Sequence, residues 1–263
     1  MLQKIIDAYV WFFAKPAFEK FNKLLFRLSL AGLGVLNYKN SRVSGEQSFL
    51  KNYLSGKNGV VIDVGANEGN YSAEVLDFNP SVKVYAFEPH PVTFEKLSGK
   101  LSANHQVTIV NKGLSDSAGF LELYDYENKD GSSHASLFPE VITEIHGAGK
   151  AISHKVSLTT LDDFIEKNSI DIISLLKIDT EGNELKVLRG GVEALKSKKI
   201  AAIHFEFNEM NVASRCFFRD FWKILDGYRF YRLLPNGMME IKQYSPLQCE
   251  IFAYQNIVAI LKD

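Results

Sequence analysis

The chain has 263 residues, of which 46% are apolar and 12% aromatic, so it can bury one sizeable core but is too short for two full domains. A net charge of −1 argues against a general nucleic-acid binder, and we expect no nucleic-acid partner. The two cysteines, Cys216 and Cys249, provide neither a disulfide framework nor a cysteine-based metal site, so the expected location is a reducing cytoplasm.

Residues 1–36 mix large apolar side chains with charged ones and are interrupted by Pro16. They contain no run of ~18 uncharged apolar residues, which a membrane span requires. A small-residue cleavage site, which a signal peptide requires, is also absent. We therefore predict amphipathic helices whose apolar faces pack on the core, on another copy of the chain in a homo-oligomer, or peripherally on the inner membrane surface.

The pattern Ser44-Gly-Glu-Gln47 predicts a capping box that opens a further helix through about Leu54. Together with the preceding helices it would form an N-terminal helical extension over residues 1–55. The remaining residues, 56–263, would form the main domain.

In that domain, apolar runs alternate with helical patterns: strands at 60–64, 83–87 and 107–111, and helices near 71–78 and 91–103. Such alternation indicates a parallel sheet with helices on both faces. Core strands are expected again at 170–178 and 200–207, with helices starting near 161, 185 and 214. Closing strands at 228–234, 238–243 and 250–261 are expected to be partly antiparallel.

An insertion at about 120–160 interrupts this alternation. Its predicted strands, 120–126 and 155–161, flank a polar segment at 127–150. Loops carried on a rigid scaffold often contact the substrate, and we expect substrate contacts in this segment.

A glycine-rich turn follows the first strand in the run Asp63-Val-Gly65-Ala66-Asn67-Glu-Gly69. We expect Gly65 and Gly69 to let a ligand lie directly against the backbone, where a Cβ would intrude. Glu88 ends the second strand, about 20 residues further on. At this place a carboxylate can accept hydrogen bonds from both hydroxyls of a ribose. The sequence therefore predicts a nucleoside-containing cofactor.

The acidic residue before the turn distinguishes between such cofactors. Asp63 would repel a pyrophosphate but suits a cationic sulfonium and an amino group, which favours S-adenosylmethionine over NAD. An NAD-dependent dehydrogenase is one alternative. A non-catalytic cofactor-binding or membrane-associated protein with the same fold is another.

Five motifs together resemble the FkbM family of S-adenosylmethionine-dependent methyltransferases: Ser44-Gly-Glu46, Ile62-Asp-Val-Gly-Ala-Asn-Glu-Gly69, Phe87-Glu-Pro89, Asn111-Lys-Gly-Leu-Ser-Asp116 and Leu176-Lys-Ile-Asp-Thr-Glu-Gly-Asn-Glu-Leu185. The resemblance covers roughly residues 44–210. It implies the class I methyltransferase fold: an α/β, Rossmann-like three-layer sandwich whose seven-stranded, mostly parallel sheet has an antiparallel closing strand. It also implies O-methylation (EC 2.1.1), often of sugars in bacterial glycoconjugates or of hydroxyls on secondary metabolites. Of these, the expected acceptor is a sugar or glycoconjugate.

Ligands of open parallel sheets bind at the carboxyl ends of the strands. The residues expected to bind the cofactor there are Asp63, Gly65, Ala66, Asn67, Gly69, Glu88, Pro89, Gly113, Leu114, Ser115 and Asp116. In particular, the adenine ring is expected against Leu114.

Methyl transfer to an alcohol requires alignment of the acceptor and removal of its proton. The leading candidates are Asp179 and Glu181 after the fourth core strand and Glu206 on the next. Lys177 and His134 are further catalytic candidates, Lys177 as a buried amine paired with a carboxylate and His134 as a general base. His204, on a strand, could act as a base in the same way, although a structural role is the commoner one for either histidine. The carboxylates could instead share a divalent cation, with Asn208 as a further ligand.

Overall fold

The structure is a computed structural model that describes residues 1–126, 131, 135 and 151–262. Its main sheet has the strand order β10-β9-β11-β8-β7-β1-β2-β3. The parallel strands are β1 (Val60–Val64), β2 (Lys83–Phe87), β3 (Val107–Val110), β7 (Ile173–Ile178) and β8 (Ala202–Phe207). At the other side, β11 (Gln255–Leu261) runs antiparallel to β8 and to β9 (Tyr228–Leu234). The α/β class I architecture expected from the sequence is confirmed.

The sheet has eight strands rather than the predicted seven. The additional strand, β10 (Gly237–Ile241), forms an antiparallel hairpin with β9 at the edge. The sequence predicts this closing strand at 238–243, so only the number of strands implied by the family resemblance is too low.

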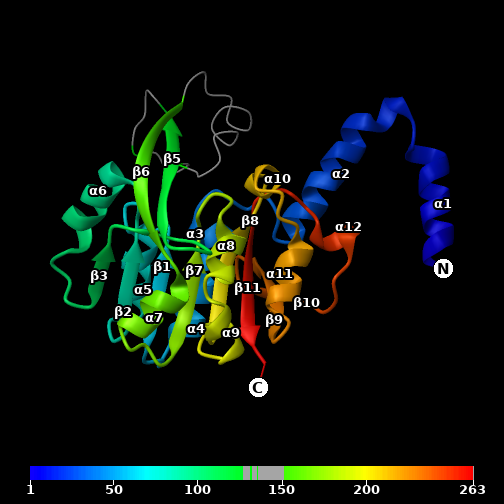
Figure 1. Cartoon of the computed structure of the whole chain (residues 1–263). Helices are drawn as coiled ribbons and strands as arrows, with labels where there is room; N and C mark the ends of the chain where they lie inside the picture. The colour runs from blue at the N-terminus through cyan, green and yellow to red at the C-terminus, as the bar shows by residue number, and fades with distance from the viewer. Residues whose placement is uncertain (127–130, 132–134, 136–150, 263) are drawn as a thin grey trace.

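Helices cover both faces of the sheet, which makes three layers (Figure 1). Alternate residues of the central strands point to opposite faces: Val61 and Leu175 pack with α4 (Glu46–Leu54) and α5 (Asn70–Phe78). Ile62 and Leu176 pack with the helices of the other face, which are α7 (Leu161–Lys167), α8 (Glu184–Arg189), α9 (Val192–Lys196) and α11 (Phe218–Ile224). Because both faces are buried, these strands are mostly apolar, and the exceptions include Asp63 in β1 and Ser174 and Lys177 in β7.

A second sheet with the order β4-β6-β5 rises beside the carboxyl ends of the main strands (Figure 1). It consists of β4 (Gly113–Leu114), β5 (Gly119–Tyr126) and β6 (Ala151–Thr159). The two strands expected within the insertion, at 120–126 and 155–161, are thus present, although β6 begins four residues earlier and ends at Thr159. Most of the polar segment 127–150 lies outside the described residues.

The N-terminal segment contains α1 (Leu2–Phe13), the 3-10 turn Pro16–Phe18, α2 (Glu19–Gly32) and α3 (Ser41–Ser44). No residue of α1 is buried, and Leu30 is the buried residue of α2. Both helices project from one side of the domain (Figure 1). Packing on the core is therefore confined to the end of α2. Within the described residues, no helix is sufficiently long and apolar to cross a membrane.

The predicted capping box at Ser44 is wrong. Ser44 ends α3 and its hydroxyl bonds the Glu46 carboxylate at 3.0 Å, while α4 begins after Gly45. Gly45 has a φ of +92°, and a Cβ there would lie 2.4 Å from the carbonyl oxygen of Leu234. A tertiary contact with the edge of the sheet therefore fixes this junction, and the domain boundary near residue 55 stays a prediction.

The remaining helices are α6 (Pro91–Leu101), α10 (Met210–Ala213) and α12 (Pro246–Cys249). Of these, α6 packs beneath the glycine-rich turn through Leu97 and Leu101. It thereby supports the part of the molecule where the site is expected.

Candidate active site

Three hollows meet at the carboxyl ends of β1, β2, β7 and β8, and all three are lined by Gly65, Asn67 and Asp179. The Leu114 hollow is also lined by Val64, Glu88, Pro89, Gly113, Leu114, Leu123, Ala135, Leu158, Thr180, Glu181 and Asn183. The Lys177 hollow is also lined by Ser41, Glu46, Asp63, Ala66, Asn70, Tyr71, Ala73, Glu74, Asp77, Lys100 and Lys177. The Tyr38 hollow is also lined by Tyr38, Glu181, Glu206, Asn208, Glu209, Met210 and Tyr254.

The glycines of the turn are required for packing within the protein. Gly65 has a φ of +80°, and a Cβ there would lie 1.8 Å from the carbonyl oxygen of Asp179. Gly69 has a φ of +79°, and its Cβ would lie within 2.7 Å of Leu97 and Leu101. Gly69 lines none of the three hollows. Packing against the end of β7 and against α6 is therefore one reason for glycine at these positions. The expected contact of the glycines with a ligand stays a prediction.

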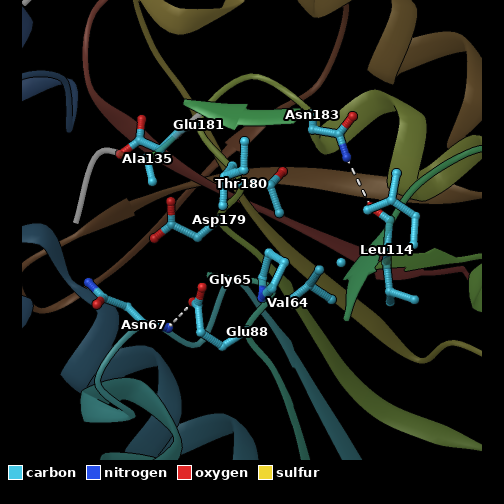
Figure 2. Close-up of a pocket in the computed structure, with 14 residues that line it drawn as sticks. Val64, Gly65, Asn67, Glu88, Leu114, Ala135, Asp179, Thr180, Glu181 and Asn183 are labelled. Carbon is cyan, nitrogen blue, oxygen red and sulfur yellow. Dashed lines mark hydrogen bonds between the residues drawn. The ribbon is translucent and has the colours of Figure 1, made fainter. Parts of the chain in front are cut away.

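Glu88 lies in the Leu114 hollow with both carboxylate oxygens held by backbone (Figure 2). One oxygen accepts the N–H of Asn67 at 2.9 Å and the other the N–H of His90 at 2.8 Å. Burial raises the pKa of Glu88 to about 7, although these two N–H groups favour the ionised form. Since a carboxylate has about four acceptor sites, each oxygen can accept a further donor, such as a ribose hydroxyl.

The loop after β3 contributes only part of what the sequence predicted. Gly113 and Leu114 line the Leu114 hollow, and the side chain of Asn183 donates to the Leu114 carbonyl oxygen at 2.9 Å (Figure 2). Ser115 and Asp116 do not line it. The carbonyl of Ser115 instead lies so close to Gly190 that a Cβ on Gly190 would be 2.0 Å from its oxygen.

Residues 63–230 match the family described as the methyltransferase FkbM domain. The chain belongs to the FkbM methyltransferase family. The match begins at Asp63, at the glycine-rich turn, and extends into β9, so it includes the strand ends that form the three hollows.

Curated relatives of this FkbM chain include methyltransferase sdnD of Sordaria araneosa, 33% identical over 51% of this chain and 60% of that protein. The hexuronic acid methyltransferase AglP of Haloferax volcanii is 30% identical over 58% of this chain and 59% of the relative. The chain thus spans about three-fifths of the length of these relatives. The 2-O-methyltransferase NoeI of Sinorhizobium fredii is 19% identical over 68% of this chain and 76% of the relative.

Among solved structures, the precorrin-6y C5,15-methyltransferase of Geobacter metallireducens is similar, with 12% identity and a TM-score of 0.42 over 82% of this chain and 87% of that one.

In this FkbM domain, the Lys177 hollow contains a buried cation among carboxylates. The ammonium of Lys177 lies 3.3 Å from Asp179 and 3.9 Å from Glu46. Burial alone would lower the pKa of Lys177, but Asp179, Glu46 and Glu206 raise it above its usual value, so the amine stays charged. Lys177 therefore holds Asp179 in place and is not suited to remove a proton.

Asp63 lies deeper in the same hollow and accepts a hydrogen bond from Ser72 at 2.6 Å. Burial raises its pKa to about 6, while Ser72 and Lys177 favour the ionised form. Asp63 thus carries a negative charge at neutral pH, as the sequence predicted for the residue preceding the turn.

His204 is not placed to act as a base. It is fully buried, with Nδ1 3.0 Å from the Tyr71 hydroxyl and Nε2 3.0 Å from the Asn256 side-chain oxygen. Burial and the charge of Lys177 lower its pKa well below the usual value. It is therefore a neutral structural residue. His134, the other histidine considered, lies outside the described residues.

The Tyr38 hollow gathers the remaining catalytic candidates. Burial and the nearby charge of Asp179 raise the pKa of both Glu181 and Glu206 well above the usual value. The Asn208 side chain donates to Glu206. The Tyr38 and Tyr254 rings meet edge to face at the wall of the hollow, 6.0 Å between centroids.

Within the described ranges, no three His, Cys, Asp or Glu side chains are grouped to hold a metal ion. The divalent cation considered from the sequence therefore has no support in the structure.

The residues missed by sequence reasoning include Tyr38, Tyr71, Thr180, Asn183 and Tyr254. Tyr38 and Tyr254 are far in sequence from the carboxyl ends of the parallel strands, so no local pattern predicts that they lie at the site. Thr180 and Asn183 lie within the Lys-Ile-Asp-Thr-Glu-Gly-Asn motif, which was the available signal.

Proposed function

We propose that the protein is an S-adenosylmethionine-dependent O-methyltransferase that acts on a hydroxyl of a sugar or glycoconjugate. The observation that carries this proposal is the meeting of three hollows at Gly65, Asn67 and Asp179. A methyl transfer requires one place for the nucleoside, one for the amino-acid end of the donor and one for the acceptor, all adjoining the reacting atoms.

The Leu114 hollow is lined by the kinds of group that bind a nucleoside. Leu114, Leu123 and Leu158 provide apolar walls for a base, and Glu88 provides the acceptor for a ribose diol. Figure 2 places Asn67 and Glu88 along one side of this hollow and Asp179, Thr180 and Glu181 along the other.

The Lys177 hollow fits the methionyl end. It offers the charges that an amino-acid end group needs, an ammonium from Lys177 and carboxylates from Asp63, Glu46 and Glu74. When bound, S-adenosylmethionine supplies a methyl group on a positively charged sulfur. The acceptor oxygen attacks the methyl carbon in line with the carbon–sulfur bond, and the neutral thioether leaves. The carboxylate of Asp179, at the junction, would attract this positive charge.

The Tyr38 hollow fits a polyhydroxylated acceptor. Its carboxylates and the Asn208 amide can bond hydroxyl groups, and the rings of Tyr38 and Tyr254 offer surfaces on which the C–H face of a sugar can pack. The names of AglP and NoeI, a hexuronic acid methyltransferase and a 2-O-methyltransferase, support a saccharide acceptor.

Asp179 is the proposed proton acceptor because it lines both the acceptor hollow and the two donor hollows. Lys177 fixes its side chain at 3.3 Å. Glu206 and Glu181, whose pKa values are raised, lie in the same acceptor hollow and can take over the proton from Asp179. Asp179 would thus assist the acceptor oxygen as its bond to carbon forms.

The experiment is transfer of labelled methyl from S-adenosylmethionine to sugars, nucleotide sugars and cell-envelope extracts, with and without a chelator. Labelled saccharide is expected. Failure with every acceptor, despite tight S-adenosylhomocysteine binding, would favour the non-catalytic alternative. Loss of activity on addition of a chelator would support a role for a divalent cation.

Family membership removes the support for an NAD-dependent dehydrogenase, and titration with NAD should give no binding. A cytoplasmic location stays a prediction from the free thiols of Cys216 and Cys249.

A further inference from the structure

The N-terminal hairpin, formed by α1, the turn at 14–18 and α2, exposes an unusual amount of apolar surface. Leu2 is 70% exposed, Trp11 69% and Phe26 64%. Ile5, Val10, Phe12, Leu24 and Leu28 are more than half exposed as well. Soluble domains rarely leave so many neighbouring large apolar side chains in water, so this surface is expected to be covered by a partner.

The hairpin is a built structure rather than a loose tail. The ring of Phe13 contacts those of Phe18 and Phe21 at 5.1 and 5.6 Å between centroids, and the side chain of Asn22 donates to the Phe13 carbonyl at 2.9 Å. The hydroxyl of Tyr9 donates to Asn22 across the two helices. These contacts join the two helices near the turn.

The base of the hairpin is anchored to the domain. Val35, just beyond α2, is fully buried and pairs with Gln255 in an isolated β-bridge. The N–H of Leu36 donates to the Tyr254 carbonyl at 2.7 Å. The surface is thus held at a defined place, and the chain reaches the wall of the Tyr38 hollow two residues later.

Charge indicates which partner fits. Residues 1–36 contain five basic side chains, Lys4, Lys15, Lys20, Lys23 and Arg27, and two acidic ones, so their net charge is +3, whereas the rest of the chain has a net charge of −4. A second copy would bring the same positive charges together. An anionic lipid surface instead attracts them and accepts the aromatic and aliphatic side chains between its headgroups.

We propose that the N-terminal hairpin docks on an anionic lipid bilayer, with Trp11, Phe12 and the exposed leucines inserted at the headgroup level and the basic residues beside the lipid phosphates. The sequence of α2 is amphipathic: basic residues and large apolar residues each recur about once per helical turn. This pattern is typical of helices that lie in a membrane surface. This inference does not depend on methyl transfer.

Co-sedimentation of the full chain with vesicles tests the proposal. We expect sedimentation with an equal mixture of phosphatidylcholine and phosphatidylglycerol and little with phosphatidylcholine alone. The Trp11→Ser/Phe12→Ser variant should bind at least about tenfold more weakly, because it loses two inserted side chains. The Lys20→Gln/Lys23→Gln variant should bind roughly twentyfold more weakly, from the attraction of each charge.

Matched controls are Phe120→Ser, since Phe120 is 65% exposed on β5, and Lys51→Gln/Lys223→Gln, which removes two exposed charges elsewhere. Neither should change vesicle binding. In a Trp222→Phe background, the emission of Trp11 should shift to shorter wavelength when anionic vesicles are added.

Three outcomes would overturn the proposal: no binding to either vesicle, equal binding to both, or binding that the two hairpin variants leave unchanged. Light scattering measures whether the chain instead forms a dimer through this surface. A dimer that Trp11→Ser/Phe12→Ser dissociates, together with an absence of vesicle binding, would assign this surface to a second copy of the chain.

Discussion

The backbone of Gly65 lies against the carbonyl group of Asp179, so closely that a Cβ on the glycine would be 1.8 Å from the carbonyl oxygen. The two residues belong to the ends of neighbouring strands, β1 and β7, and both line all three hollows. The point where donor and acceptor are proposed to meet is therefore set by contact between two backbones.

Replacement of Gly65 by alanine should destabilise the protein by about 3 kcal/mol or more, because the new methyl group overlaps the carbonyl and a φ of +80° strains a non-glycine residue. Urea unfolding measures the effect. Gly99→Ala is the control, since Gly99 lies inside α6 with open space around its Cβ position, and should stabilise the protein by about 0.5–1 kcal/mol. Equal stability of Gly65→Ala and the unmodified chain would refute the contact.

Replacement of Glu88 by glutamine should weaken S-adenosylhomocysteine binding by about 100-fold, because the two charge-assisted hydrogen bonds proposed from the ribose hydroxyls would be lost or weakened. Isothermal titration measures this change. Glu122→Gln, on the exposed side of β5, should leave the affinity unchanged. A wild-type affinity in Glu88→Gln would contradict the proposed position of the ribose.

The affinity for S-adenosylhomocysteine should rise with pH between about 6 and 8, because the pKa of Glu88 is raised to about 7 and hydroxyl donors favour its ionised form. Stability of the free protein should change in the opposite direction. Because the pKa of Glu88 is raised from 4.5 to about 7 in the folded protein, its protonation favours folding below pH 4.5. This contribution to the free energy of unfolding, about 3 kcal/mol at most, is lost as the pH rises through 7.

Titrations between pH 6 and 8 measure the affinity, and urea unfolding between pH 4 and 8 measures the stability. Glu88→Gln should flatten the first trend and reduce the second, to which other buried carboxylates also contribute. An affinity that falls between pH 6 and 8 would have the wrong sign for a carboxylate that binds a diol.

Replacement of Asp179 by asparagine should lower kcat by roughly 100-fold or more, because the proposed proton acceptor is removed. The affinity for S-adenosylhomocysteine should change by no more than about threefold, since Glu88 retains its contacts. Single-turnover methyl transfer and titration separate the two effects. Asp171→Asn, at an exposed position before β7, is the control. Full activity of Asp179→Asn would move the role of base to Glu206 or Glu181.

Particular elements illustrate what the sequence could predict. The strands β1, β2 and β7 were located within three residues because long β-branched and aliphatic runs are typical of strands buried on both faces. Glu88 was placed at the site because a residue that ends a parallel strand must lie at the carboxyl edge of the sheet. The capping box at Ser44 was wrong because the next residue, Gly45, packs against the distant segment at Leu234.

The amino-acid sequence by itself determined the α/β alternation, the glycine-rich turn and the order in which acidic residues reach one edge of the sheet. These follow from local periodicity and from the direction of parallel strands. Only the tertiary structure decided that the turn glycines accommodate β7 and α6, that Tyr38 and Tyr254 line one hollow together, that Lys177 pairs with Asp179 and Glu46, and that α1 has no buried residue. Each of these depends on contacts between residues far apart in the chain, which no local pattern of side chains encodes.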